Sequence, residues 1–166
     1  IGHVRYKTSG KLVNKEIQPF IINNIALCHN GNISNYDKIN KVGLNLRTDS
    51  DSELLLALFQ KELLKYNTLN NKIIVSVIKT ISKICLGSFS VIILIKNYGL
   101  VCFKDPYGIR PLIYGKKENT NTYLISSESP SLINNDFKII DEIKGGEIVI
   151  FKNENNKIIV NNYNYE

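Results

Sequence analysis

The chain has 166 residues, of which 43% are hydrophobic and 22% are charged, and its formal net charge is +6. This length fits one domain and excludes a large multidomain machine, and the composition is that of a globular protein and excludes a disordered or fibrous chain. No stretch reaches the roughly 20 consecutive apolar residues of a transmembrane helix, so we expect no membrane partner.

The positive charge does not indicate a nucleic-acid partner. Nucleic-acid binding is favoured where basic residues gather in patches with aromatic residues between them. Here the lysines are spread over the whole chain, and the only arginines are Arg5, Arg47 and Arg110. We therefore expect the chain to bind no nucleic acid.

Cysteine usage and the start of the chain bear on where the protein works. Cys28, Cys85 and Cys102 are odd in number and far apart, which is typical of a reducing compartment. No secretory signal is visible, so we expect a cytoplasmic protein. Because the sequence contains no methionine and begins at Ile1 inside a predicted strand, we interpret it as a piece of a longer product.

The first part of the chain is predicted to form strands. Short β-branched runs predict strands over residues 1–7 and 20–29, the second ending at a tight turn made by Asn30 and Gly31. Residues 34–46 are consistent with a short helix.

Two helices are predicted in the middle of the chain, over residues 51–66 and 71–86. Ser50 and Glu53 have the spacing of a capping box at the start of the first helix, and Gly87 ends the second. The first helix is apolar nearly all round, so we expect it to lie between other layers.

The rest of the chain is predicted to be a series of strands, near residues 88–96, 100–104, 112–114, 122–126, 137–140, 147–151 and 157–161. Helices in the middle and strands on both sides predict an α+β fold in which sheets are stacked with helices on their outer faces. No repeat, linker or second domain is visible.

Two candidate site segments lie in the first strands. Arg5 could present its guanidinium to a carboxylate, although on its own such a residue is more often a plain surface arginine. Cys28 and His29 are neighbours in a strand and point to opposite faces, so they are rejected as a nucleophile and its base. Asn30 and Gly31 could supply an amide and a backbone N–H to an oxyanion, but composition alone favours a plain turn.

Two further segments have simple structural explanations. Asp51 lies in the first turn of the long helix, where the helix dipole favours an acid without any ligand. Asp105, Pro106 and Gly108 fit positions i, i+1 and i+3 of a type I turn, which would make a rigid connection between two strands.

Taken in order, these segments resemble the glutaminase domain of the amidophosphoribosyltransferases. The matching stretches are IGHVRY at 1–6, QPF at 18–20, HNGN at 29–32, SDSELLL at 50–56, DPYGIRPL at 105–112, SSES at 126–129 and GGE at 145–147. They span nearly the whole chain in the family's order. The glucosamine-6-phosphate synthases share the HNG core and the pair Asn35 and Tyr36, but GHVRY, SDSE and DPYGIRPL are typical of the first family.

The resemblance implies a fold and a set of roles. The fold would be the four-layer αββα sandwich of the N-terminal nucleophile hydrolases, truncated at its N-terminus. Arg5 would bind the α-carboxylate of glutamine, Asp51 its α-ammonium, and Thr8 would help to position it. The amide of Asn30 and the N–H of Gly31 would form the oxyanion hole.

The sequence departs from the family at its nucleophile. The family uses a cysteine at the N-terminus of the mature chain, whereas residue 1 here is Ile1, and none of the three cysteines lies where it could replace that residue. The phosphoribosyltransferase domain expected after a glutaminase domain is also absent, so residues 1–166 would be a partial glutaminase domain. We predict that this chain alone is inactive.

The implied parent reaction is the first committed step of purine biosynthesis, in which glutamine and phosphoribosyl pyrophosphate give 5-phosphoribosylamine. We expect no cofactor in this domain, magnesium in the missing phosphoribosyltransferase domain, and a homo-oligomer when the enzyme is complete. The alternatives are the glutaminase domain of a glucosamine-6-phosphate synthase type enzyme, and an inactive remnant.

Overall fold

The structure is a computed structural model that describes residues 1–4 and 16–166. The predicted site residues Arg5 and Thr8, and most of the strand predicted over residues 1–7, lie outside the described residues. Residues 1–4 are described and are not in a strand.

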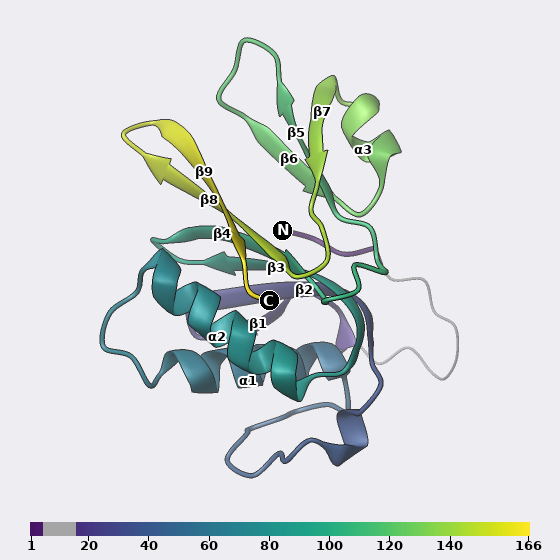
Figure 1. Cartoon of the computed structure of the whole chain (residues 1–166), viewed down its shortest axis with the longest axis vertical. Helices are drawn as coiled ribbons and strands as arrows, with labels where there is room; N and C mark the ends of the chain where they lie inside the picture. The colour runs from purple at the N-terminus through teal and green to yellow at the C-terminus, as the bar shows by residue number, and fades with distance from the viewer. Residues whose placement is uncertain (5–15) are drawn as a thin grey trace.

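A large antiparallel sheet is the centre of the fold (Figure 1). Its strands, in spatial order, are β1 (Phe20–Ile22), β2 (Ile25–Ile33), β3 (Gly87–Ile95), β4 (Gly99–Lys104), β8 (Glu147–Glu154) and β9 (Lys157–Asn164). Because side chains alternate along each strand, every second residue of this sheet faces the same neighbouring layer.

Two helices, α1 (Asp51–Leu63) and α2 (Asn71–Ile84), cover one face of the large sheet (Figure 1). Both begin where the sequence predicts and end two or three residues earlier. Their apolar side chains form one core with side chains from the facing side of the sheet. Leu27 of β2, Val91 of β3 and Phe103 of β4 are among them and are fully buried. Residues 54–59 of α1 are buried, as the apolar pattern predicts, but the prediction that α1 lies between layers is wrong, because α1 belongs to the outer helical layer beside α2.

The opposite face of the large sheet packs against a small antiparallel sheet with the strand order β6 (Tyr123–Ser126), β5 (Ile113–Lys117) and β7 (Phe137–Glu142). The ring centroid of Tyr114 in β5 lies 5.5 Å from that of Phe151 in β8. The next residue, Gly115, lies against Leu132 of helix α3 (Ser129–Ile133). The sequence did not predict this helix. The layers therefore run helix, sheet, sheet, helix, as the αββα prediction requires.

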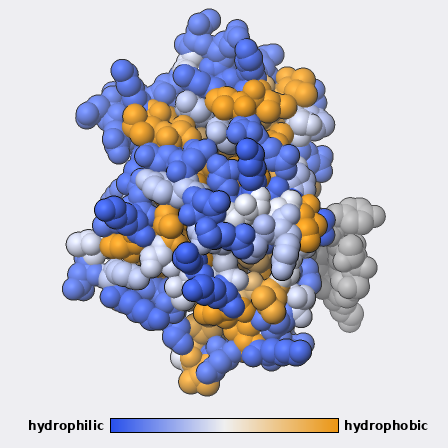
Figure 2. All heavy atoms as spheres, viewed as in Figure 1, coloured by the Kyte–Doolittle hydropathy of each residue, from blue (hydrophilic) through white to orange (hydrophobic). Residues whose placement is uncertain are grey.

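The side of the molecule seen in Figure 2 is mixed in character. Hydrophilic residues cover most of it, with an orange patch at the bottom and further orange patches over the small sheet at the top. Ile133, Ile139 and Ile140 are among the exposed apolar side chains of this region. In the described part of the chain, no helix is long and apolar enough to cross a membrane.

Two local predictions are wrong. Asn30 and Gly31 do not form a turn, because they continue β2 in register with β3; the reversal occurs earlier, at Asn23, whose φ is 51°. Residues 34–46 contain only a short 3-10 helix, η2 (Tyr36–Lys38).

Candidate functional site

The free edge of β2 carries three backbone N–H groups that point away from β3. In an antiparallel pair, alternate residues direct their N–H groups toward the same side. The N–H of His29 donates to the Oε1 atom of Gln18 over 2.6 Å, and that of Ile33 donates to the Oδ2 atom of Asp51 over 3.0 Å. The N–H of Gly31 lies between these two on the same edge.

Gly31 is the residue type that this position demands. Its φ is 150°, and an added Cβ atom would lie 1.9 Å from the backbone oxygen of Ser88. A side chain at this position is therefore incompatible with the pairing of β2 and β3. The positive φ that suggested a turn in the sequence instead allows the two strands to approach closely.

Asn30 lies next to this N–H and presents its side chain on the inner face of the large sheet, toward the small sheet. It is half-buried and pairs with Ser90 in β3. Among the described residues, none forms a hydrogen bond with its amide group. Asn30 and Gly31 thus place a side-chain donor and a backbone donor side by side at the rim of the sheet.

Asp51 brings a carboxylate to the same place from the first turn of α1. Its Oδ2 atom accepts the hydrogen bond from Ile33, two residues after Gly31, and its Oδ1 atom lies 3.8 Å from the Nδ1 atom of His29. Its side chain is one quarter exposed. The structure therefore joins Asn30, Gly31 and Asp51, three of the five predicted site residues, in one place.

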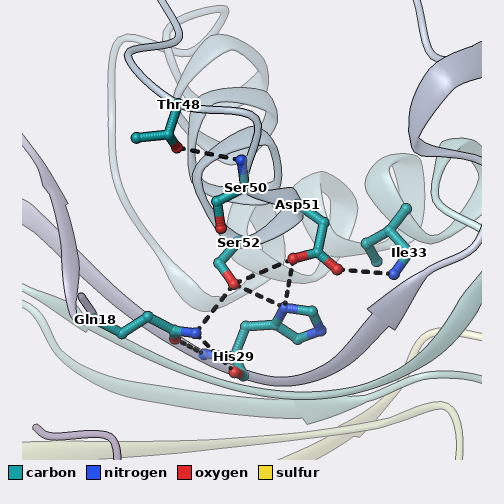
Figure 3. Close-up of polar contacts among 7 residues, drawn as sticks. All are labelled: Gln18, His29, Ile33, Thr48, Ser50, Asp51 and Ser52. Atoms are coloured by element: carbon teal, nitrogen blue, oxygen red, sulfur yellow. Dashed lines mark hydrogen bonds and ion pairs between the residues drawn. The ribbon is translucent and has the colours of Figure 1, made fainter. Parts of the chain in front are cut away.

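A hydrogen-bond network centred on the buried His29 and Ser52 fixes this arrangement (Figure 3). The Nδ1 atom of His29 lies 3.0 Å from the Oγ atom of Ser52, and the Nε2 atom of Gln18 donates to that same oxygen over 3.1 Å. Gln18 also donates to the backbone oxygen of His29 over 3.1 Å, so its amide pairs with β2 as a backbone would. The strand that carries Asn30 is thus tied to the helix that carries Asp51.

Burial determines the charge state of His29. Its side chain is almost fully buried, and this burial lowers the pKa of His29, an effect that the nearby Asp51 carboxylate opposes. The imidazole of His29 is therefore uncharged at neutral pH. Sequence reasoning considered His29 only as a partner for Cys28 and missed its contact with Ser52, which is 23 residues away.

The loop before α1 is held by Glu53, and the predicted capping box is wrong. Ser50 occupies the N-cap position, but its side chain makes no capping hydrogen bond. The fully buried carboxylate of Glu53 accepts from the N–H groups of Arg47 and Thr48, from the Thr48 hydroxyl and from the Arg47 guanidinium. Burial raises the pKa of Glu53, but these hydrogen bonds outweigh it and the net pKa is lowered.

The predicted turn after β4 is confirmed. The N–H of Gly108 donates to the backbone oxygen of Asp105 over 3.1 Å, as a type I turn requires. The buried Asp105 side chain also accepts from the N–H groups of Phe89, Tyr107 and Gly108. This turn is therefore anchored to β3, the strand beside β2.

The three cysteines are poor candidates for a nucleophile. Cys28 lies on the inner face while His29 faces α1, in agreement with the rejection of that pair. Burial raises the pKa of all three thiols, that of Cys85 to about 12, which disfavours the reactive thiolate. In the described ranges, no group of three or more His, Cys, Asp or Glu side chains is arranged to hold a metal ion.

Comparison with known proteins shows which family the chain belongs to. The family model described as "Glutamine amidotransferase domain" matches residues 3–134. The chain is 38% identical to the amidophosphoribosyltransferase of Saccharomyces cerevisiae over 163 residues, covering 90% of this chain and 32% of that protein. It is 35% identical to the amidophosphoribosyltransferase of Escherichia coli over 167 residues, covering 93% of this chain and 33% of that protein.

Solved structures agree at the level of the fold. A structure titled as the allosteric regulatory enzyme of purine biosynthesis matches with a TM-score of 0.81 at 25% identity, covering 99% of this chain and 34% of that one. A glutamine phosphoribosylpyrophosphate amidotransferase from B. subtilis, complexed with ADP and GMP, matches with a TM-score of 0.77 at 24% identity and the same coverage. The chain spans about one third of the length of these relatives, and it belongs to the glutamine amidotransferase domain family.

Proposed function

We propose that this chain is the glutamine-binding and oxyanion-stabilising part of an amidophosphoribosyltransferase. The observation that carries the proposal is the convergence of the Asn30 and Gly31 donors with the Asp51 carboxylate at one edge of the large sheet. The relatives that share 35–38% of its residues bear the name amidophosphoribosyltransferase, which supports this reaction over that of a glucosamine-6-phosphate synthase.

Glutamine carries an α-carboxylate, an α-ammonium and a side-chain carboxamide, and each needs its own partner. The Asp51 carboxylate would hold the ammonium, and the one-quarter exposure of its side chain allows a ligand to reach it. Arg5 and Thr8 would complete the pocket at the carboxylate end. The carboxamide would then extend along the edge of β2 toward Asn30 and Gly31.

The chemistry is attack on that carboxamide by a cysteine thiolate supplied from outside this sequence. As the thiolate adds to the carbonyl carbon, the carbonyl oxygen becomes an oxyanion, and the Asn30 amide and Gly31 N–H would donate to it. The tetrahedral intermediate releases ammonia and leaves a thioester, which water hydrolyses to glutamate. At a phosphoribosyltransferase domain that binds magnesium, in the cytoplasm, the ammonia would attack the anomeric carbon of phosphoribosyl pyrophosphate and displace pyrophosphate to give phosphoribosylamine.

The test uses the full-length polypeptide that carries these residues and measures phosphoribosylamine formation with glutamine and, separately, with free ammonia. Replacing Asp51 by Asn is expected to raise the KM for glutamine at least about 10-fold, because a charge-assisted bond to the ammonium is lost. Use of ammonia should not change.

The matched control is Asp49→Asn, which removes the same charge from an exposed position two residues away. It should leave both activities unchanged. Equal effects of the two substitutions would argue against an ammonium site at Asp51, and a wild-type polypeptide without glutamine-dependent activity would favour the inactive remnant.

A further inference from the structure

A row of polar side chains crosses the inner face of the large sheet. Asn30 in β2 pairs with Ser90 in β3, and Ser90 pairs in turn with Lys104 in β4. These strands are neighbours in the sheet, as Figure 1 shows. The parallel row two residues away is composed of Cys28, Ile92 and Cys102, which are less polar. The row on the other side, Asn32 with Ser88, is also polar but is more exposed than the pair of Asn30 and Ser90.

Ser90 is the buried hydroxyl of this row. It is 3% exposed, and its Oγ atom has no hydrogen-bond partner within the described part of the chain. A buried hydroxyl without a partner is unfavourable and calls for an explanation. Packing alone does not explain the serine at this position, because an alanine would fill nearly the same space without burying a polar atom.

Lys104 does not satisfy Ser90. Its Nζ atom is buried and lies 3.0 Å from the Oε1 atom of Glu142 in β7, so its charge is paired across the two sheets. The remaining polar neighbour of Ser90 in the row is Asn30, whose amide group is also without a hydrogen bond to any described residue. Two adjacent polar groups, neither with a hydrogen-bond partner among residues 1–4 and 16–166, thus face each other across β2 and β3.

Directly opposed side chains of an antiparallel pair have Cβ atoms about 4.5–5.5 Å apart, which is within reach of a hydrogen bond between a hydroxyl and an amide. The amide of Asn30 has two N–H groups. If one donates to the Ser90 oxygen, the plane of the amide is fixed and the other N–H is directed away from β3, toward the edge that carries the Gly31 N–H. An oxyanion donor is effective when it is oriented before the charge develops.

We propose that Ser90 is a positioning residue that orients the Asn30 amide toward the oxyanion formed during glutamine hydrolysis. This inference rests on the proposed function. Ser90 acts through Asn30 and does not itself contact the substrate.

The experiment compares two serine-to-alanine variants of the full-length polypeptide by steady-state glutamine hydrolysis. Ser90→Ala is expected to lower kcat about 5- to 30-fold with the KM within about twofold, a smaller loss than removal of an oxyanion donor itself. Ser88→Ala is the matched control, because Ser88 pairs with Asn32 on the same face of the same two strands. It should retain the wild-type kcat.

Two further variants separate positioning from structural damage. In an Asn30→Ala background, Ser90→Ala should cause no additional loss, because there is no amide left to orient. Ser90→Thr, which keeps the hydroxyl, should retain most of the wild-type kcat. The proposal is overturned if Ser90→Ala matches Ser88→Ala, or if it reduces kcat by the same factor with and without Asn30.

These outcomes are distinct from failure of the proposed function. A wild-type polypeptide that does not hydrolyse glutamine overturns both proposals. A wild-type polypeptide that does so, and whose Ser90→Ala variant is unimpaired, overturns this one alone.

Discussion

The imidazole of His29 and the hydroxyl of Ser52 lie 3.0 Å apart in the interior, where β2, the strand next to the edge strand β1, contacts the first turn of α1. His29 directly precedes Asn30, and Ser52 directly follows Asp51. This one contact therefore joins the strand that carries the proposed oxyanion donors to the helix that carries the proposed ammonium ligand, and it fixes the spacing between them.

The buried His29 makes the stability of the chain depend on pH. Because burial lowers its pKa, the unfolded chain binds a proton to this residue more readily than the folded chain does. The contribution of neutral His29 is fully present above the unfolded pKa of about 6.5 and is lost as the pH falls from there toward the lower folded pKa.

The prediction is that the free energy of unfolding falls more between pH 7.5 and pH 5.5 in the wild type than in His29→Gln, by roughly 1 kcal/mol. Urea unfolding at the two pH values measures this. Parallel pH dependence in the two proteins would show that His29 does not titrate differently on folding.

Gly31→Ala should disrupt the fold itself. The new Cβ atom would lie 1.9 Å from the backbone oxygen of Ser88, and the φ of 150° is unfavourable for alanine. We expect the free energy of unfolding to fall by more than about 3 kcal/mol. Gly43→Ala is the control, because Gly43 also has a positive φ but has open space around it, and it should cost only about 1 kcal/mol. Similar midpoints for the two variants in urea would contradict the close strand approach.

Glu53→Gln tests the loop that leads into the site. Its carboxylate is fully buried and accepts four hydrogen bonds from Arg47 and Thr48, so neutralising it should cost about 1–3 kcal/mol at pH 7. The control is Glu62→Gln, since the Glu62 carboxylate pairs with Lys65, three residues further on, whose side chain is largely exposed.

The lowered pKa of Glu53 gives this prediction a second readout. The stabilisation is present above the unfolded pKa of about 4.3 and is lost as the pH falls through the lower folded pKa. The difference between wild type and Glu53→Gln should therefore shrink in acid unfolding below pH 4. A difference that is constant with pH would mean that the loop is held by other contacts.

The sequence was most informative where local signals act over short distances. The two helices and the strands after Gly87 were predicted to within a few residues, because periodicity, capping and turn residues operate within one element. The turn at Asp105 was found for the same reason. The pairing of the strands into two sheets and the position of α3 depend on contacts between distant segments.

The site was identified only in part from the residues. Asn30 and Gly31 were assigned to a turn, since no local signal reveals that Gly31 is needed for its close approach to Ser88. The contacts of His29 with Gln18 and Ser52 join residues 11 and 23 positions apart, and the sequence contains no sign of them. The prediction that Asp51 serves the site came from the family resemblance, because the helix dipole already accounts for an acid at that position.

The most direct test of the oxyanion assignment is the kcat for glutamine hydrolysis by the full-length polypeptide with Asn30→Ala, measured beside Asn32→Ala. Asn32 lies on the same face of β2 two residues further on and is exposed, so its loss should not affect the reaction. The account predicts that Asn30→Ala lowers kcat by about 10²-fold or more while Asn32→Ala leaves it unchanged. An Asn30→Ala variant with the kcat of the wild type would contradict it.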